Sequence, residues 1–157
     1  MQIPLPKGIS GFSEGTDISA GRMMITRINS ALTDNESIAF ETTLSGRTWV
    51  KLIGQAVDKG YQVTLGFIAV SSVEEAISRV ERRVLEGGHS IPKEVILRRY
   101  SRSLSMFFNV YRNIVSQWFF FDNTEKNSNL VAYRSNGNEI ILNAELYAVY
   151  QRQISGN

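Results

Sequence analysis

The sequence contains no cysteine and a single histidine, His89, among its 157 residues. Disulfides, zinc–thiolate sites and thiol catalysis are therefore excluded, and so is any metal motif that needs a pair of histidines. No apolar run approaches the length of a membrane span, and the opening segment MQIPLPKGIS lacks the apolar core of a signal peptide. The sequence therefore predicts a cytoplasmic protein with no membrane partner and no metal site built from its own side chains.

A further absence concerns phosphate binding. The phosphate-cradling loop of many nucleotide-binding proteins needs the pattern G-x-x-x-x-G-K-[ST], in which a lysine directly follows a glycine. Lys7 precedes Gly8, and no lysine of the sequence directly follows a glycine. These residues therefore contain no such loop.

The composition is that of an ordinary globular domain, with 43% hydrophobic and 20% charged residues. Lys and Arg number 17 and Asp and Glu 15, which leaves a formal charge of +2. That margin is too small to indicate nucleic-acid binding, and the basic residues are not interleaved with aromatic ones. We therefore expect no nucleic-acid partner and a single domain over residues 1–157.

Hydrophobic periodicity and turn residues predict a mixed order of helices and strands. Helices are predicted over residues 17–32, 49–59, 72–86, 93–115 and 144–153, and strands over residues 37–41, 61–70, 117–122, 130–134 and 139–142. The serines between 101 and 105 leave open a break in the fourth helix. Strands alternating with helices are typical of a parallel sheet. The predicted fold class is therefore α/β, a parallel sheet with flanking helices, followed by a hairpin around SNGN and a final helix.

Ligands of parallel sheets bind beyond the carboxyl ends of the strands. Three segments of this sequence qualify as such strand ends, namely residues 41–46, 70–72 and 122–123. The topology therefore predicts where a site lies, although it does not identify the chemistry.

The segment FETTLSGRT, residues 40–48, follows the first predicted strand. The carboxylate of Glu41 and the hydroxyls of Thr42 and Thr43 can bond sugar or nucleoside hydroxyls, while Arg47 can pair with phosphate. The alternative is that one of the hydroxyls caps the next helix, and Thr43 or Ser45 is expected to do so in either case. A carboxylate at the end of a buried strand is harder to explain by structure alone, which favours a functional role.

Six arginines flank the segment GGHSIP, residues 87–92. They are Arg79, Arg82, Arg83, Arg98, Arg99 and Arg102. Spacings of three and four residues within each triplet allow each to project from one helix face, and two such faces joined by a glycine hinge would close over a polyphosphate. The alternative is a solvated surface with ordinary ion pairs, because Glu75 and Glu94 precede Arg79 and Arg98 by four residues. His89 would then be a loop side chain in water rather than a phosphate contact.

The strings AGR, AFETTLSGRT, RVERRV, GGHSIPKEVILRRY and W-x-x-x-DN follow one another between Ala20 and Asn123. In this combination the sequence resembles the zeta-toxin-like P-loop kinases. The resemblance implies a doubly wound, three-layer P-loop NTPase fold, with ATP and Mg²⁺ as cofactors. It also implies transfer of the terminal phosphoryl group to a small-molecule acceptor, a sugar hydroxyl of UDP-N-acetylglucosamine in zeta toxins proper, and a protein partner or antitoxin.

Carried over by motif, the resemblance places Glu41 and Thr43 at acceptor-binding positions. Thr42 and Ser45 stand where zeta toxins proper usually have glycine and arginine. The resemblance therefore does not identify the acceptor of this chain.

The same resemblance assigns residues 79–99 to the lid that neutralises the transferring phosphate. One of Arg79, Arg82 and Arg83 would occupy the first lid position. His89 lies near the second, with Arg98 and Arg99 as nearby substitutes. Asp122 and Asn123 match the strand end on the nucleotide-base side.

The family opens with a strand, the phosphate loop, a helix and a strand with the presumed base aspartate, and this sequence begins after all of them. The expected sheet is therefore incomplete at its N-terminal end. Phosphoryl transfer depends on that loop for positioning and for Mg²⁺, so we expect this chain to be inactive by itself. It would be a fragment, one half of a two-chain site or a degenerate gene product. The alternative function is a non-catalytic binding module that pairs its open sheet edge with a partner strand.

Overall fold

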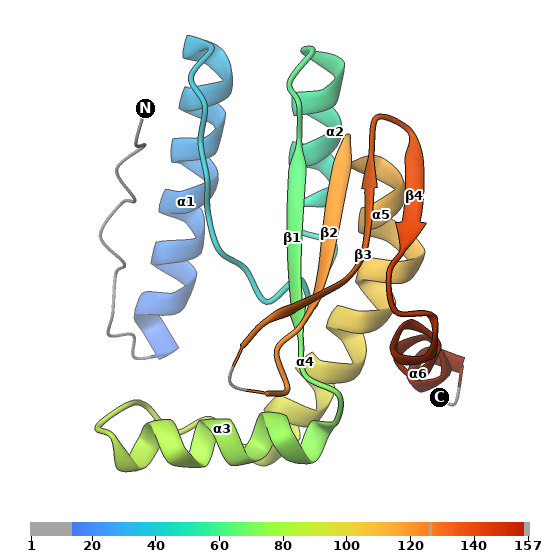
Figure 1. The fold of residues 1–157 in the computed structure, drawn as a ribbon. Coiled ribbons are helices and arrows are strands. Elements are labelled where there is room, and N and C mark those ends of the chain that lie inside the picture. Colours follow the sequence, from blue (N-terminus) through green and yellow to red (C-terminus); the bar gives the residue numbers. More distant parts are fainter. Residues whose placement is uncertain (1–13, 126, 156–157) are drawn as a thin grey trace. The chain divides into compact units, whose positions relative to one another are not determined.

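The computed structural model describes residues 14–125 and 127–155, and the chain divides into two compact units, residues 1–39 and 40–157 (Figure 1). The first unit contains helix α1 (Glu14–Asp34), where the sequence predicted a helix over residues 17–32. None of the helices in the described ranges combines the length and apolar character needed to cross a membrane.

The second unit is built on a mixed sheet. Its strands are β1 (Thr64–Ala69), β2 (Gln117–Asp122), β3 (Asn129–Ser135) and β4 (Asn138–Ile141), and they lie in the order β1-β2-β3-β4. β1 and β2 are parallel, whereas β3 and β4 are added antiparallel. The predicted α/β class, with helices flanking the sheet and a hairpin after the parallel strands, is confirmed.

Helices precede β1, connect β1 to β2 and follow β4. They are α2 (Val50–Asp58), α3 (Val73–Leu85), α4 (Lys93–Met106), the π-helical stretch η1 (Phe107–Tyr111), α5 (Arg112–Ile114) and α6 (Ala144–Ser155). Figure 1 shows α2, α4 and α5 on one face of the sheet, with α3 crossing below the ends of β1 and β2.

The break left open near residues 101–105 is not present. Ser101 and Ser103 donate from their hydroxyls to the carbonyls of Leu97 (2.9 Å) and Tyr100 (3.0 Å), so the helix absorbs these polar groups without interruption. The irregularity lies just beyond them, in η1.

Local turn chemistry agrees with the predicted helix start at residue 72 and the predicted hairpin around SNGN. Ser72 precedes α3 and accepts a hydrogen bond at its Oγ from the backbone N–H of Glu75 (3.2 Å). Asn136 and Gly137 connect β3 and β4 with φ values of 51° and 78°, the pair of positive angles that a tight hairpin turn requires.

The strand predicted over residues 37–41 is wrong. No strand pairing involves this segment, and Phe40 and Glu41 are exposed. Phe40 instead packs locally on Trp49, with ring centroids 4.9 Å apart. A short apolar run becomes a strand only where a neighbouring backbone completes its ladder, and none does so here.

The core of the second unit is aromatic. Alternate residues of β2 are buried, so that Trp118 and Phe120 face the helices and are fully shielded from solvent. Phe107 of η1 lies between them and β1, with its ring 5.4 Å from Trp118, 5.2 Å from Phe120 and 4.6 Å from Phe67. The same alternation brings the last residue of β2, Asp122, to the buried side.

Candidate functional site

The carboxyl ends of β1 and β2 lie side by side, because Ala69 is paired with Asp122 in the parallel register. The backbone N–H of Asn123 extends the pairing by donating to the carbonyl of Ala69 (2.7 Å). Two of the three predicted strand ends, residues 70–72 and 122–123, therefore meet as expected. The third, residues 41–46, does not follow a strand.

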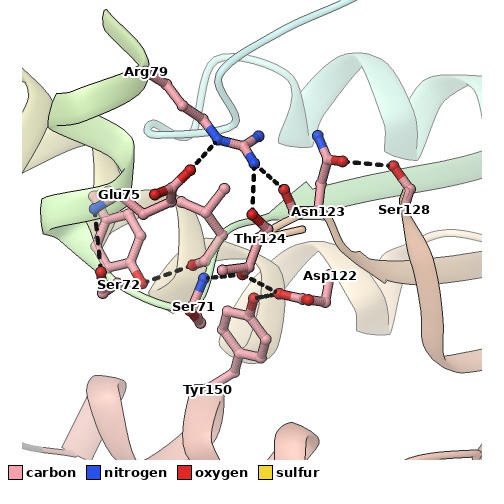
Figure 2. A network of polar contacts seen from close by, with 11 residues as sticks. Ser71, Ser72, Glu75, Arg79, Asp122, Asn123, Thr124, Ser128 and Tyr150 are labelled. Carbon is pink, nitrogen blue, oxygen red and sulfur yellow. Dashed lines mark hydrogen bonds and ion pairs between the residues drawn. The ribbon is translucent and has the colours of Figure 1, made fainter. Parts of the chain in front are cut away.

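Asp122 is the centre of a hydrogen-bond network at this edge (Figure 2). Its side chain is buried, and its Oδ1 accepts from the hydroxyl of Thr124 (2.6 Å) and from the hydroxyl of Tyr150 on α6. Thr124 in turn accepts from the backbone N–H of Ser71 (2.8 Å). Burial, and then the hydrogen bond to Asp122, raises the pKa of Tyr150, so its hydroxyl remains a donor. The Asp122 carboxylate, predicted to lie on the base side of a nucleotide, is therefore directed into the protein.

Arg79 is the predicted lid arginine that reaches this network. Its Nε pairs with Glu75 one turn earlier on α3 (2.7 Å), and its guanidinium donates to the backbone carbonyls of Asn123 and Thr124, the latter at 3.1 Å. Figure 2 shows these contacts converging above the strand end. Since one of its terminal nitrogens donates to both of these carbonyls, Arg79 anchors α3 to the end of β2.

A second set of contacts connects α4 and α6 to residues 70 and 71, which follow β1. The hydroxyl of Tyr100 on α4 lies 2.9 Å from the carbonyl oxygen of Val70 and 2.7 Å from Oε1 of Gln153. Gln153 donates through Nε2 to the carbonyl of Ser71 (2.7 Å). Sequence reasoning missed Tyr100, Tyr150 and Gln153. The signal available was the spacing of three residues between Tyr150 and Gln153, which places both on one face of the final helix.

The pKa of Tyr100 predicts how stability depends on pH. Burial raises this pKa from 10.0 to about 12, so the folded protein holds the phenol proton more tightly than the unfolded chain. The resulting stabilisation is complete below pH 10 and is lost as the pH rises through about 12. We expect urea unfolding at about pH 8 and about pH 11 to show this loss in the parent protein.

Tyr100→Phe removes part of that loss. Burial also raises the pKa of Tyr111, Tyr147 and Tyr150, so some pH dependence persists in the variant. An identical pH dependence in Tyr100→Phe and in the parent protein would contradict the assignment.

The remaining predicted lid residues lie on the solvent side of α3 and α4 and in the loop between them. Arg82, Arg83, Arg98, Arg99 and His89 are all exposed. Within residues 14–125 and 127–155 none of them forms an ion pair, so the pair between Glu94 and Arg98 that the solvated-surface alternative suggested is not formed.

The groove between α3 and α4 is apolar rather than arginine-lined. Its volume is about 330 Å³, and it is lined by Ile77, Val80, Glu81, Val84, Leu85, Ser90, Ile91, Lys93 and Ile96. Gly88 allows the tight exit from α3, since an added Cβ would lie 2.7 Å from Cγ of Arg83. None of the predicted lid arginines lines this groove.

The segment from Glu41 to Arg47 forms a separate exposed loop. Thr42 accepts at its Oγ1 from the indole N–H of Trp49 (2.8 Å), and Thr43 and Ser45 bond to each other (3.0 Å). The expectation that Thr43 or Ser45 caps the next helix is wrong, because α2 has no side-chain cap and these hydroxyls are used within the loop.

Leu44 and Tyr111 fix the position of this loop. Leu44 is buried with a left-handed φ of 55°, and the hydroxyl of Tyr111 donates to the carbonyl of Gly46 (2.5 Å). Glu41 and Arg47 remain exposed, and no hydrogen bond or ion pair in the described part of the chain links them to α3 or to Asp122. The predicted site residues thus form three groups. Asp122, Asn123 and Arg79 meet at the end of β2, the other lid residues are exposed around α3 and α4, and residues 41–47 form the loop.

The residues present do not by themselves fit a nucleoside triphosphate with Mg²⁺. The sequence contains no phosphate loop, and the carboxylate of Asp122 is used by Thr124 and Tyr150. In the described ranges no three acidic or histidine side chains gather as metal ligands.

Comparison with known proteins identifies relatives of this chain. The family model described as "Zeta toxin" matches residues 7–138. An uncharacterized protein of Haemophilus influenzae is 33% identical over 84 residues, which cover 54% of this chain and 60% of the relative. The chain thus matches about three fifths of that relative's length, and no solved structure matches. Since the family model covers most of the sequence, including the loop after Phe40, the arginine helices and β2, the chain belongs to the zeta toxin family.

Proposed function

We propose that this chain provides the acceptor-binding and lid portion of an ATP-dependent small-molecule kinase of the zeta toxin type. The acceptor would be a small hydroxyl compound such as a sugar nucleotide. The observation that carries the proposal is the set of exposed arginines on α3 and α4, Arg82, Arg83, Arg98 and Arg99, which have no acidic partner within the described residues. Membership of the zeta toxin family supports it, because that family has a P-loop kinase-like fold.

Arginine suits this role because its planar guanidinium offers paired donors to phosphate oxygens. Arg79 holds α3 against the end of β2, and Arg82 and Arg83 follow it by three and four residues. The anchored turn would therefore fix the start of the lid while Arg82 and Arg83 stay free for a phosphate group. Glu41, exposed on its loop, would accept a hydrogen bond from an acceptor hydroxyl.

We expect the purified 157-residue chain to show no Mg²⁺-dependent ATP turnover. The sequence lacks the loop whose backbone and lysine position the phosphates, and arginines alone supply charge without that geometry. The measurement is phosphate release and acceptor phosphorylation with ATP, Mg²⁺ and UDP-N-acetylglucosamine. Turnover that is lost in Arg82→Ala or Arg83→Ala would overturn this expectation.

A binding experiment tests the lid assignment itself. Titration calorimetry with inorganic tripolyphosphate should detect binding that weakens roughly tenfold in Arg82→Ala/Arg83→Ala, the loss of charge-assisted hydrogen bonds. Arg27→Ala, an exposed arginine of α1 outside the predicted set, is the matched control and should bind as the parent does. Equal weakening in both variants would indicate nonspecific charge attraction and contradict a lid site.

A specific observation also favours the second candidate, a non-catalytic binding module. Arg79 donates to the carbonyl of Thr124, and the hydroxyl of Thr124 donates to Asp122, so these polar groups bind the protein itself. A chain that retains the fold and the exposed arginines, yet binds neither tripolyphosphate nor UDP-N-acetylglucosamine, would support this candidate over the kinase portion.

A further inference from the structure

The edge formed by β4 is unusually apolar. β4 is the last strand of the sheet in the described part of the chain, and Ile140, Ile141 and the following Leu142 are 41%, 44% and 57% exposed. Natural proteins commonly protect such edges with charged residues, proline or bulges, because the free backbone groups pair readily with another strand. An apolar run on a free edge is therefore a candidate for strand pairing.

The hairpin register shows which backbone groups of β4 are free. The turn at Asn136 and Gly137 pairs Ser135 with Asn138, and antiparallel partners alternate between bonded and non-bonded positions. The N–H of Leu142 bonds to the carbonyl of Val131 (2.9 Å), which agrees with inward bonding at residues 138, 140 and 142. The N–H and C=O groups of residues 139 and 141 therefore point away from β3.

An apolar row on one sheet face leads to this edge. Phe119 is paired with Tyr133, and Tyr133 with Ile140, so the three side chains lie in line across β2, β3 and β4. The rings of Phe119 and Tyr133 stack with centroids 6.0 Å apart. The row stops at the exposed side chain of Ile140, where a further strand would continue it.

We propose that β4 pairs antiparallel with β4 of a second copy of this chain, about a two-fold axis at Ile140. The groups at 139 and 141 that point away from β3 are placed symmetrically about Ile140, so an identical strand satisfies each of them. Glu139 then exchanges its backbone hydrogen bonds with Ile141 of the partner subunit. Ile140 faces the partner subunit's Ile140 in the closely spaced, non-hydrogen-bonded pair, and the apolar row continues into the second sheet.

The charges near the edge suit a second copy. Glu139 lies on the other sheet face, where its carboxylate is 3.6 Å from Arg112 and 3.5 Å from the hydroxyl of Tyr147. In the two-fold register it is opposite Ile141 of the partner subunit, so the two Glu139 carboxylates do not face each other. No like-charge contact therefore opposes the pairing, which does not depend on the proposed kinase role.

Cross-linking tests the register directly, because the parent chain has no cysteine. Across a non-hydrogen-bonded antiparallel pair, Cβ atoms lie roughly 4.5–5.5 Å apart, close enough for a disulfide after small adjustment. We expect full-length Ile140→Cys to form a covalent dimer with oxidised glutathione. Ile68→Cys, on the opposite edge strand β1 and 64% exposed, should form no covalent dimer under the same conditions. Equal cross-linking of both variants, or none at position 140, would overturn the proposal.

Sedimentation equilibrium supplies the second readout. The parent chain at about 100 μM should have twice its monomer mass of 17.7 kDa. Ile141→Pro removes an N–H that the pairing with β3 does not use. This variant should therefore have the monomer mass in sedimentation and a folded circular dichroism spectrum. Ile140→Lys should also be monomeric, which keeps the test valid if the proline variant unfolds. A parent monomer at that concentration, or a dimer that persists in Ile140→Lys, would show that β4 is not the interface.

Discussion

Replacing Phe107 with alanine is expected to lower the free energy of unfolding of the second unit by about 3–5 kcal/mol. Phe107 is fully buried, and its ring contacts Phe67 of β1 together with Trp118 and Phe120 of β2. Truncation removes the ring that joins both parallel strands to η1 and leaves a cavity between elements that belong to different layers. The surroundings can relax little, because their aromatic rings are themselves buried.

Tryptophan fluorescence during urea unfolding measures this effect, since both tryptophans of the chain, Trp49 and Trp118, lie in the second unit. Leu85→Ala is the control. Leu85 is also a large apolar side chain but is 88% exposed, so its truncation should change stability by less than about 0.5 kcal/mol. Losses of similar size in the two variants would show that Phe107 is not the packing centre.

The parts of the fold that the sequence predicted correctly depend on contacts between near neighbours. Ser72 and Glu75 begin α3 through a cap that spans three residues, and Asn136 with Gly137 closes a two-residue turn. The parallel pairing of β1 and β2 followed from strands separated by helices, which restricts the connection to a crossover. Periodicity and turn chemistry are sufficient for features of this kind.

The strand prediction for residues 37–41 was wrong because strand formation depends on a partner outside the segment. Its apolar residues fit a buried strand, but a strand also needs a hydrogen-bonding neighbour, and nothing in the segment itself specifies one. Phe40 instead packs on the nearby ring of Trp49.

The candidate site shows the same limit. A pattern of arginines at spacings of three and four predicted a common face, yet Arg79 turns to carbonyls 44 and 45 residues away while Arg82 and Arg83 are exposed. Likewise Asp122 is held by Tyr150, 28 residues later, a partner that no local pattern indicates. Residue type and spacing identified the strand ends, whereas the choice between binding a ligand and binding the protein depended on distant elements.

Asp122→Ala is expected to destabilise the protein by about 3 kcal/mol, since it leaves the buried hydroxyl of Tyr150 without its acceptor and removes hydrogen bonds to a charged group. Asp122→Asn retains an acceptor oxygen, so its loss should be smaller. A carboxylate that served mainly to contact a nucleotide would be solvent-facing in the absence of ligand, and its removal would cost less than about 0.5 kcal/mol. Urea unfolding of the two variants therefore decides between a structural and a ligand-binding role at this position.

The double variant Asp122→Ala/Tyr150→Phe separates the two hydrogen bonds that meet at Oδ1 of Asp122. Tyr150→Phe alone removes the donor that Asp122→Ala leaves unsatisfied, while Thr124 still donates to the carboxylate (2.6 Å). If the pair acts as a unit, the double variant should be more stable than the sum of the single losses predicts, by roughly 1–2 kcal/mol. Additive losses would mean that Tyr150 and Asp122 contribute independently. α6 would still be joined to Tyr100 of α4 and, through Gln153, to the carbonyl of Ser71 after β1.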